Sequence, residues 1–111
     1  MRLAVVGDPV DHSLSPAIHA AALRAAGIAG SYTRMRVDAA GMAGVAAAIR
    51  RGGLDGVNVT MPHKGLAVNL VDGTAGAVDR TGSANTITRV GDRLIGHNTD
   101  VSGVCSAWGA A

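Results

Sequence analysis

Short apolar stretches alternate along the chain with segments whose apolar residues recur at helical spacing. Uninterrupted apolar or alternating runs predict strands at Arg2–Gly7, Tyr32–Val37, Gly56–Thr60, Ala84–Arg89 and Arg93–Gly96. Apolar residues three or four positions apart predict helices at Ser15–Ala26, Gly41–Arg51, Lys64–Val71 and, from a weaker pattern, Ala75–Arg80. Gly27 and the pair Gly52-Gly53 end the first two helices, and Gly91-Asp92 predicts a hairpin turn.

This order of elements predicts the α/β class. Strands that alternate with helices of about 10 residues form a mostly parallel, twisted sheet with helices on both faces, in three α/β/α layers. We expect about six strands with one antiparallel element, which the last hairpin contributes. A length of 111 residues allows one domain with one core, and we assign residues 1–111 to it.

Composition and charge narrow the class of ligand. A single cysteine, Cys105, excludes an internal disulfide and favours a reducing, cytoplasmic setting. No apolar run approaches the roughly 20 residues of a membrane span, so we expect no membrane partner. The net charge is +2, but the basic residues are scattered, and one Trp and one Tyr give nucleic-acid bases little to stack on. We therefore expect a small anionic ligand and no nucleic acid.

Four polar clusters lie at the ends of predicted strands. The stretch "GDPVDHSLSP" follows the first strand, and "NVTMPHK" lies at the end of the third. The stretch "SANT" lies after the fourth strand or just within it, and "GHNTD" follows the fifth. In open α/β sheets, ligands bind in the crevice beyond the carboxyl ends of the strands. We therefore expect all four clusters to converge on one rim.

The hydroxyl and amide residues of these clusters are candidates for binding an anion with polar substituents. Ser13 and Ser15 lie at the start of a helix, where hydroxyls and free backbone N–H groups together can hold a carboxylate. On residue type alone, Ser15 acting only as a helix cap is the commoner explanation, and both roles can hold at once. Thr60, Asn85 and Asn98 offer neutral donors and acceptors for ring hydroxyls, although each could equally satisfy a loop.

Lys64 and Asp100 are the candidate catalytic pair. Burial lowers the pKa of a lysine and a neighbouring carboxylate raises it, so a lysine at a cleft edge can be tuned to donate or accept a proton near neutral pH. The alternative is a surface ion pair, worth under about 1 kcal/mol. His12 and His19 lack the spacing of a metal-ligand set, so we expect no metal and interpret them as structural.

The four motifs together resemble the amino-terminal, substrate-binding domain of shikimate dehydrogenases. "GDPVDHSLSPAIH", "GVNVTMPHK", "GSANTI" and "GHNTD" occur in the family's order, and the resemblance covers Val5 to Gly103. It implies NADPH-dependent, reversible reduction of 3-dehydroshikimate to shikimate in aromatic amino acid biosynthesis. It also implies that Ser13 and Ser15 contact the substrate carboxylate. The residues that it places around the ring hydroxyls are Thr60, Lys64, Asn85 and Asp100, with Lys64 and Asp100 as the catalytic dyad.

The resemblance also implies a separate Rossmann domain for NADP. The chain has no G-x-G-x-x-G and no phosphate-binding G-x-x-x-x-G-K-[ST], so we expect NADP to bind mainly to a domain absent from it, and the isolated domain to be inactive alone. Two alternatives stay open: a quinate or aminoshikimate dehydrogenase, and a non-catalytic module that binds a small hydroxy acid. Serine rather than threonine at Ser13 favours shikimate. Family members are often monomers or dimers, so a homodimer also stays open.

Overall fold

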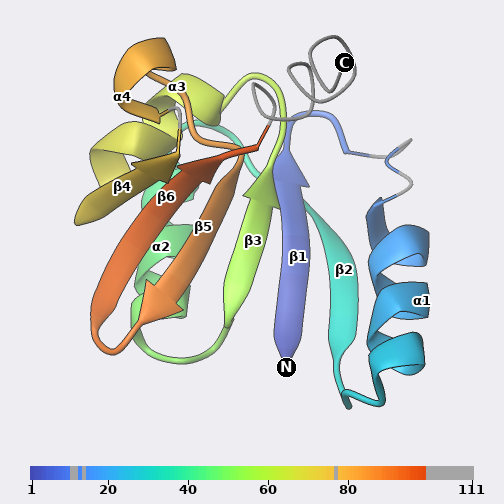
Figure 1. Cartoon of the computed structure of the whole chain (residues 1–111). Helices are drawn as coiled ribbons and strands as arrows, with labels where there is room; N and C mark the ends of the chain where they lie inside the picture. The colour runs from blue at the N-terminus through green and yellow to red at the C-terminus, as the bar shows by residue number, and fades with distance from the viewer. Residues whose placement is uncertain (11–12, 14, 77, 100–111) are drawn as a thin grey trace, which may run out of the picture.

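The computed structural model describes residues 1–10, 13, 15–76 and 78–99, which form one six-stranded sheet flanked by helices (Figure 1). The strands are β1 (Arg2–Gly7), β2 (Ser31–Arg36), β3 (Gly56–Val59), β4 (Gly73–Gly76), β5 (Thr86–Val90) and β6 (Arg93–Asn98). The helices are α1 (Ser15–Ala26), α2 (Met42–Arg50), α3 (Lys64–Ala67) and α4 (Val78–Thr81), and a 3₁₀ turn follows α3 at Val68–Leu70. Among the described residues, no helix combines the length and the apolar character that crossing a membrane requires.

The strands lie in the order β2-β1-β3-β5-β6-β4. The pairs β1–β2, β1–β3 and β4–β6 are parallel, whereas β5 is antiparallel to both of its neighbours, β3 and β6. The predicted fold class, a mostly parallel sheet with one antiparallel element, is confirmed. Because β5 runs in the opposite direction, its amino end lies at the same edge of the sheet as the carboxyl ends of the other strands. That edge carries the candidate site.

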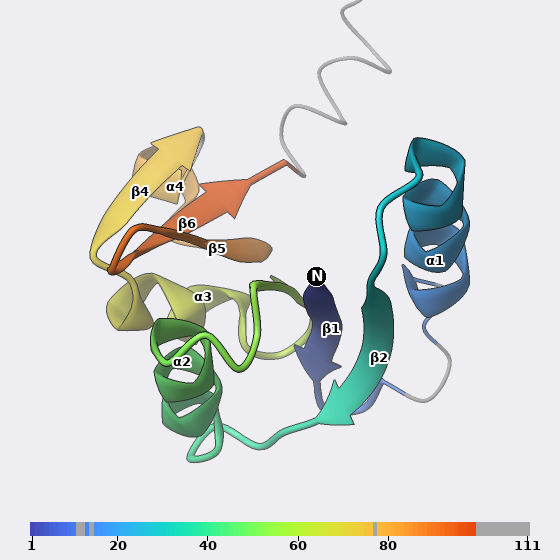
Figure 2. The same ribbon diagram turned by 90° about the horizontal axis from the view of Figure 1, so that it is seen from below.

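Helices cover both faces of the sheet, as the three-layer prediction requires. α1 lies against β1 and β2 on one face, and α2 and α3 lie on the opposite face (Figure 2). Alternation along β1 divides its side chains between the faces, since Ala4 and Val6 join the larger core while Val5 joins a small cluster with Tyr32. The buried members of the larger core are Ala4, Val6, Met42, Val45, Ala46, Ile49, Val57, Val59, Ala67, Val78, Ala84, Ile87 and Leu94.

The prediction of a helix at Ala75–Arg80 is wrong for its first part. Gly73–Gly76 forms β4, and the helix that follows, α4, covers only Val78–Thr81. β4 lies at the edge of the sheet and pairs through its backbone with β6, from Gly73 opposite Ile95 to Gly76 opposite Asn98. Its sequence, GTAG, carries almost no apolar side chain, so the pattern that indicates a strand is missing and tertiary pairing decides the conformation.

Asp72 fastens the end of α2 to the sheet at the edge opposite the site. Its carboxylate accepts hydrogen bonds from both terminal nitrogens of Arg50, at 2.7 and 3.0 Å, and from the backbone N–H of Leu94 at 2.8 Å. These hydrogen bonds, of which those from Arg50 have the largest effect, lower the pKa of Asp72 from 3.8 to about 2.

Candidate functional site

A cavity of about 260 Å³ opens at the carboxyl edge of the sheet, and we call it the rim pocket. Its lining residues are Val5, Ser13, His19, Asn58, Val59, Thr60, Lys64 and Asn85. They come from β1, the loop after it, α1, β3, the turn after β3, the start of α3 and the segment before β5. The structure thus brings Ser13, Thr60, Lys64 and Asn85 together, as the converging clusters predict.

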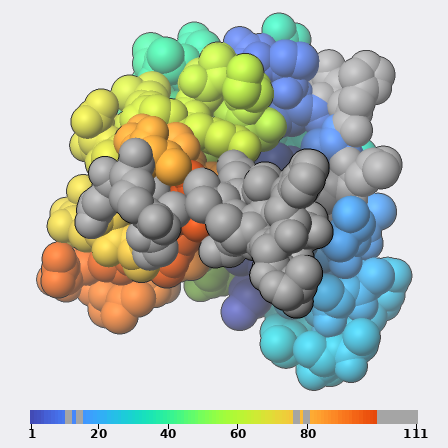
Figure 3. All heavy atoms as spheres, turned by 45° about the horizontal axis from the view of Figure 1, so that its top comes forward, coloured from blue at the N-terminus to red at the C-terminus, as the bar shows by residue number. Residues whose placement is uncertain are grey.

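Backbone hydrogen bonds hold the polar clusters against one another at this edge. The N–H of Thr60 donates to the carbonyl oxygen of Val6 at 2.9 Å, which continues the pairing of β3 with β1. On the other side, the N–H of Val59 donates to the carbonyl oxygen of Asn85 at 2.7 Å. In the space-filling view, the green segment that follows β3 lies beside the blue segment at the end of β1 (Figure 3). The cluster "NVTMPHK" is therefore fixed between the end of β1 and the segment that leads into β5.

Gly7 permits the close approach of β1 to the turn that follows β3. A Cβ at Gly7 would overlap Cγ2 of Thr60 and would lie 3.0 Å from the carbonyl oxygen of Met61. The same carbonyl oxygen accepts a hydrogen bond of 3.1 Å from the N–H of Asp8. Because Thr60 is β-branched, its side chain has few other rotamers. The missing side chain at Gly7 thus contributes to the placement of Thr60 in the rim pocket.

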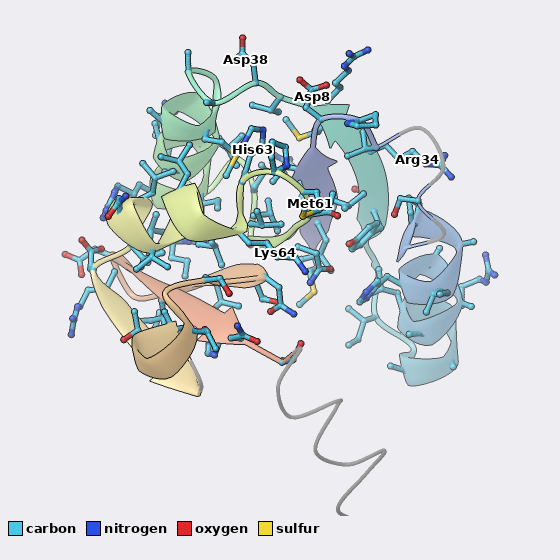
Figure 4. All side chains as sticks on the ribbon, turned by 90° about the horizontal axis from the view of Figure 1, so that it is seen from above. Asp8, Arg34, Asp38, Met61, His63 and Lys64 are labelled. Atoms are coloured by element: carbon cyan, nitrogen blue, oxygen red, sulfur yellow. The ribbon has the colours of Figure 1, made fainter. Side chains whose placement is uncertain are left out.

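The neighbours His63 and Lys64 point to different sides of the turn at the start of α3 (Figure 4). His63 is buried, and its Nε2 lies 2.5 Å from the carbonyl oxygen of Val37, the residue just after β2. Lys64 is half-buried and lines the rim pocket. In the dense polar stretch "NVTMPHK", Asn58, Thr60 and Lys64 therefore belong to the pocket, whereas His63 holds α3 against β2.

Arg34 of β2 fixes the loop that carries Ser13. The carbonyl oxygen of Ser13 accepts hydrogen bonds from Nε of Arg34 at 3.1 Å and from Nη2 at 2.6 Å. The N–H of Ser13 donates to the carbonyl oxygen of Val10 at 3.0 Å. Two donors on one planar guanidinium define the orientation of this peptide group. The guanidinium also adds a positive charge beside the pocket. α1 begins at Ser15, whose side chain lies outside the described part of the structure.

Thr99 brings the fourth polar cluster to the same site. The side-chain Nδ2 of Asn85 donates to Oγ1 of Thr99 at 2.8 Å, and the backbone N–H of Thr99 donates to Oδ1 of Asn85 at 3.2 Å. Asp100 is the next residue and lies outside the described residues. The pairing of Lys64 with Asp100 therefore stays a prediction.

Of the two roles left open for Asn98, the structure supports that of satisfying a loop. Asn98 is buried, and its Nδ2 donates to Oγ1 of Thr81 at 3.1 Å and to Ser83 at two oxygens, the carbonyl at 3.1 Å and Oγ at 3.0 Å. It thus holds the segment between α4 and β5 in place. Alternation along β6 explains the burial of Asn98, since it places Asn98 on the same face as Leu94, a member of the larger core.

Three residues near the pocket were not predicted to belong to the site: Asn58, His19 and Arg34. Asn58 is a polar residue inside the otherwise apolar strand β3, which is a signal that the sequence does contain. The ring of His19 stacks on that of Tyr32, with 4.5 Å between centroids and 3° between planes. That contact joins α1 to β2 and could be found only from the structure.

The lining of the rim pocket suits a small anion that carries hydroxyl groups. Among its described lining residues there is no carboxylate, and Lys64 contributes a positive charge. The hydroxyls of Ser13 and Thr60 and the amides of Asn58 and Asn85 both donate and accept hydrogen bonds. Within the described ranges, no group of three His, Cys, Asp or Glu side chains could hold a metal ion.

Three connections that lead from a strand to a helix lack the glycines of a dinucleotide site. Such a site needs a glycine-rich turn that brings backbone N–H groups close to the pyrophosphate. The connections at 8–14 and 60–63 contain no glycine, and that at 37–41 contains only Gly41. The sequences of these three connections therefore do not match the glycine-rich turn that holds the phosphates of NADP.

Three comparisons with known proteins agree with one another. The family model for the shikimate dehydrogenase substrate binding domain matches residues 5–87. The shikimate dehydrogenase (NADP(+)) of Exiguobacterium sibiricum is 40% identical over 107 residues, which are 96% of this chain and 41% of the relative. The corresponding enzyme of Thermus thermophilus is 41% identical over 107 residues, 96% of this chain and 40% of the relative.

The same Thermus enzyme has been solved in complex with shikimate. Its structure matches this one with a TM-score of 0.91 and 41% sequence identity, over 99% of this chain and 42% of that chain. It has also been solved with NADP(H) and shikimate together. The chain therefore spans about two fifths of the length of the relatives it matches, 41% and 40%.

Proposed function

This chain belongs to the family of shikimate dehydrogenase substrate-binding domains, and from that premise we propose that it binds shikimate and 3-dehydroshikimate in the rim pocket. The observation that carries the proposal is the convergence of Ser13, Thr60, Lys64 and Asn85 on one cavity of about 260 Å³. Shikimate is a small ring acid with three hydroxyl groups, so it needs a cation or several donors for its carboxylate and paired donors and acceptors for its ring. The rim pocket offers both kinds of group.

We assign the carboxylate of the ligand to Ser13 and Ser15. Two hydrogen bonds from Arg34 hold the backbone at Ser13, so the backbone position from which the serine hydroxyl extends is fixed. The amino end of α1 adds free backbone N–H groups and a partial positive charge. Together with the guanidinium of Arg34, these groups favour a negative charge at this end of the pocket.

We assign the ring hydroxyls to Thr60, Lys64, Asn85 and Asp100. Thr60 and Asn85 are held by backbone pairing on either side of β3, so their side chains meet the ligand from two directions. A site built to hydrogen-bond hydroxyls rejects analogues that lack them, because its polar groups would be left unpaired. Selectivity for a hydroxylated ring follows from this arrangement.

We propose that Lys64 is the proton donor and acceptor at the reacting oxygen, with Asp100 as its orienting partner. Reduction of a ketone needs a hydride at carbon and a proton at oxygen, and the described residues of this chain can supply only the proton. The relatives are named as NADP(+) enzymes, and a bound NADPH would supply the hydride. Since the connections of this domain do not fit a dinucleotide, we place the main NADP site outside the chain.

We further propose a cytoplasmic setting and a small molecule as the main partner. The single cysteine, Cys105, fits a reducing compartment. The scattered basic residues and the scarcity of aromatic side chains argue against nucleic acid as a ligand.

Titration calorimetry of the 111-residue chain with shikimate tests the proposal. We expect one binding event per chain, weaker binding of quinate, and no oxidation of NADPH when the chain is mixed with 3-dehydroshikimate. The variant Asn85→Ala should bind shikimate more weakly, and the control Ser31→Ala, an exposed serine at the start of β2, should bind it normally. Absence of shikimate binding to the folded chain would contradict the proposal.

A further inference from the structure

A chain of side-chain hydrogen bonds runs across the α1 face of the sheet and ends beside the rim pocket. The hydroxyl of Tyr32 donates to Oδ1 of Asn58 at 2.5 Å, and Nδ2 of Asn58 donates to Oγ1 of Thr86 at 3.1 Å. The hydroxyl of Thr86 donates to Oδ1 of Asn85 at 3.1 Å, and Nδ2 of Asn85 donates to Oγ1 of Thr99 at 2.8 Å. We call these residues the amide relay: Tyr32, Asn58, Thr86, Asn85 and Thr99. Both of its amides, those of Asn58 and Asn85, line the rim pocket.

All side-chain donors in the amide relay point the same way, and one backbone N–H fixes that direction. The N–H of Thr99 can only donate, so the atom of Asn85 that it meets at 3.2 Å must be the oxygen. Thr86, which contacts the same oxygen, must therefore donate to it and accept from Asn58. Because the nitrogen of the Asn58 side chain faces Thr86, its oxygen faces Tyr32, whose hydroxyl donates to it. Each amide is left with one orientation.

The far end of the amide relay is rigid. Tyr32 is only 9% exposed, its ring stacks on that of His19, and it packs in the small cluster with Val5 and Leu3. Asn58 and Thr86 are directly opposite each other in the pairing of β3 with β5, which brings their side chains together on one face. The hydroxyl of Tyr32 therefore has a fixed place from which to reach Asn58 across β1.

We propose that Tyr32 and Thr86 are positioning residues, which hold the amides of Asn58 and Asn85 in the single orientation that reads the ring hydroxyls of the ligand. This inference rests on the proposed function, since it assigns the ring end of the same pocket. An amide that turns over exchanges a donor for an acceptor at almost unchanged shape. If the hydroxyl of Tyr32 is removed, the oxygen of Asn58 loses that donor, and its amide is no longer held from both sides.

Two variants interrupt the amide relay with little change of volume: Tyr32→Phe and Thr86→Val. The control is Thr33→Val, which removes a hydroxyl from the next residue of β2, on the opposite face of the strand. The first measurement is the ¹⁵N–¹H resonance of each side-chain amide, at Asn58 and at Asn85. The second is the dissociation constant, by NMR titration of the 111-residue chain, for shikimate and for cyclohex-1-ene-1-carboxylate, which has the same acid group but no ring hydroxyls.

We expect both variants to shift the amide resonances of Asn58 and Asn85, and Thr33→Val to leave them in place. Binding of shikimate should weaken about fivefold in each variant, the size of one lost hydrogen bond, while binding of the hydroxyl-free acid stays within about twofold of the wild type. Because Thr86→Val already breaks the relay at both amides, the double variant should bind shikimate no more weakly than the weaker single variant.

Unchanged amide resonances, or equal losses for the two acids, would overturn the inference, because equal losses indicate general damage to the fold. Additive losses in the double variant would also overturn it. If the wild-type chain binds no shikimate, the proposed function fails instead, and the amide resonances alone decide whether Tyr32 and Thr86 orient the two amides.

Discussion

The N–H of Ala84 donates a backbone hydrogen bond of 2.8 Å to the carbonyl oxygen of Lys64, which ties the start of α3 to the segment that leads into β5. A second bond, from the N–H of Val59 to the carbonyl oxygen of Asn85, ties the same segment to the end of β3. Lys64 and Asn85 therefore open on the same cavity because their backbones are fastened together. The antiparallel direction of β5 makes this possible, since it brings the amino end of that strand to the carboxyl edge of its neighbours.

Removing the hydroxyl of Ser13 should weaken binding of the ligand's carboxylate. In Ser13→Ala we expect a loss of about 1 to 2 kcal/mol in the free energy of shikimate binding, the scale of a hydrogen bond to a charged group. Calorimetry with shikimate and with its methyl ester measures this, and the ester, which carries no charge, should be less sensitive. The control is Ser31→Ala. Unchanged affinity for shikimate would restrict Ser13 to shaping its loop.

A methyl group at Gly7 should displace Thr60 and strain the turn. Because a Cβ there would overlap Thr60 and crowd the backbone at Met61, we expect Gly7→Ala to lower the free energy of unfolding by about 1–3 kcal/mol, as overpacking does. Shikimate binding should weaken as well. The matched control is Gly44→Ala in α2, where nothing lies within 4 Å and alanine should stabilise the helix. Urea unfolding checks both, and equal effects of the two substitutions would contradict the close-packing argument.

Lys64 should matter more for turnover than for binding. In a protein that joins this domain to an NADP-binding domain, we expect Lys64→Ala to lower kcat about 10²- to 10⁴-fold, the usual contribution of a positioned proton donor, with a much smaller change in KM. Lys64→Arg keeps the charge but holds its proton too tightly, so it should bind shikimate and still turn over slowly. Near-normal turnover in Lys64→Ala would exclude the assigned role.

Asp72 should make the fold sensitive to acid. Its pKa is about 2 in the folded chain, below its ordinary 3.8, so the folded state binds this proton more weakly than the unfolded state does. The ionised carboxylate therefore stabilises the fold above about pH 3.8, and this contribution is lost as the pH falls towards 2. Asp72→Asn should lower the free energy of unfolding at about pH 7 and change it less at about pH 2. Asp92→Asn in the exposed turn removes the weaker charge interaction of Asp92 with Arg50, so it should change stability less than Asp72→Asn does. Urea unfolding at the two pH values decides, and an equal loss at both would contradict this assignment.

Most of the fold could be predicted from local patterns. The apolar run Arg2–Gly7 coincides with β1, and the predicted helix Ser15–Ala26 ends at Gly27, which adopts the left-handed φ of +69° typical of a helix end. β4 was missed because its strand conformation depends on pairing with β6. The predicted helix Lys64–Val71 is an α-helix only to Ala67 and then tightens into a 3₁₀ turn.

The site could be predicted in part. Ser13, Thr60, Lys64 and Asn85 lie in motifs at strand ends, so topology alone places them at one edge. Tyr32 bonds to Asn58 and Arg34 bonds to Ser13, and both contacts join residues that are distant in the sequence. Local sequence patterns do not predict such contacts. The role of Asn98 stayed open because the motif "GHNTD" does not show which of its residues face the core.

Chemical-shift mapping with shikimate tests most directly whether the rim pocket is the substrate site. As shikimate is added to the ¹⁵N-labelled 111-residue chain, the backbone resonances that move should be those of Ser13, Thr60, Lys64 and Asn85, together with the side-chain amide of Asn85. Resonances at the opposite edge, around Asp72 and Leu94, should stay in place. Shifts confined to that opposite edge, or none at saturating shikimate, would contradict the account.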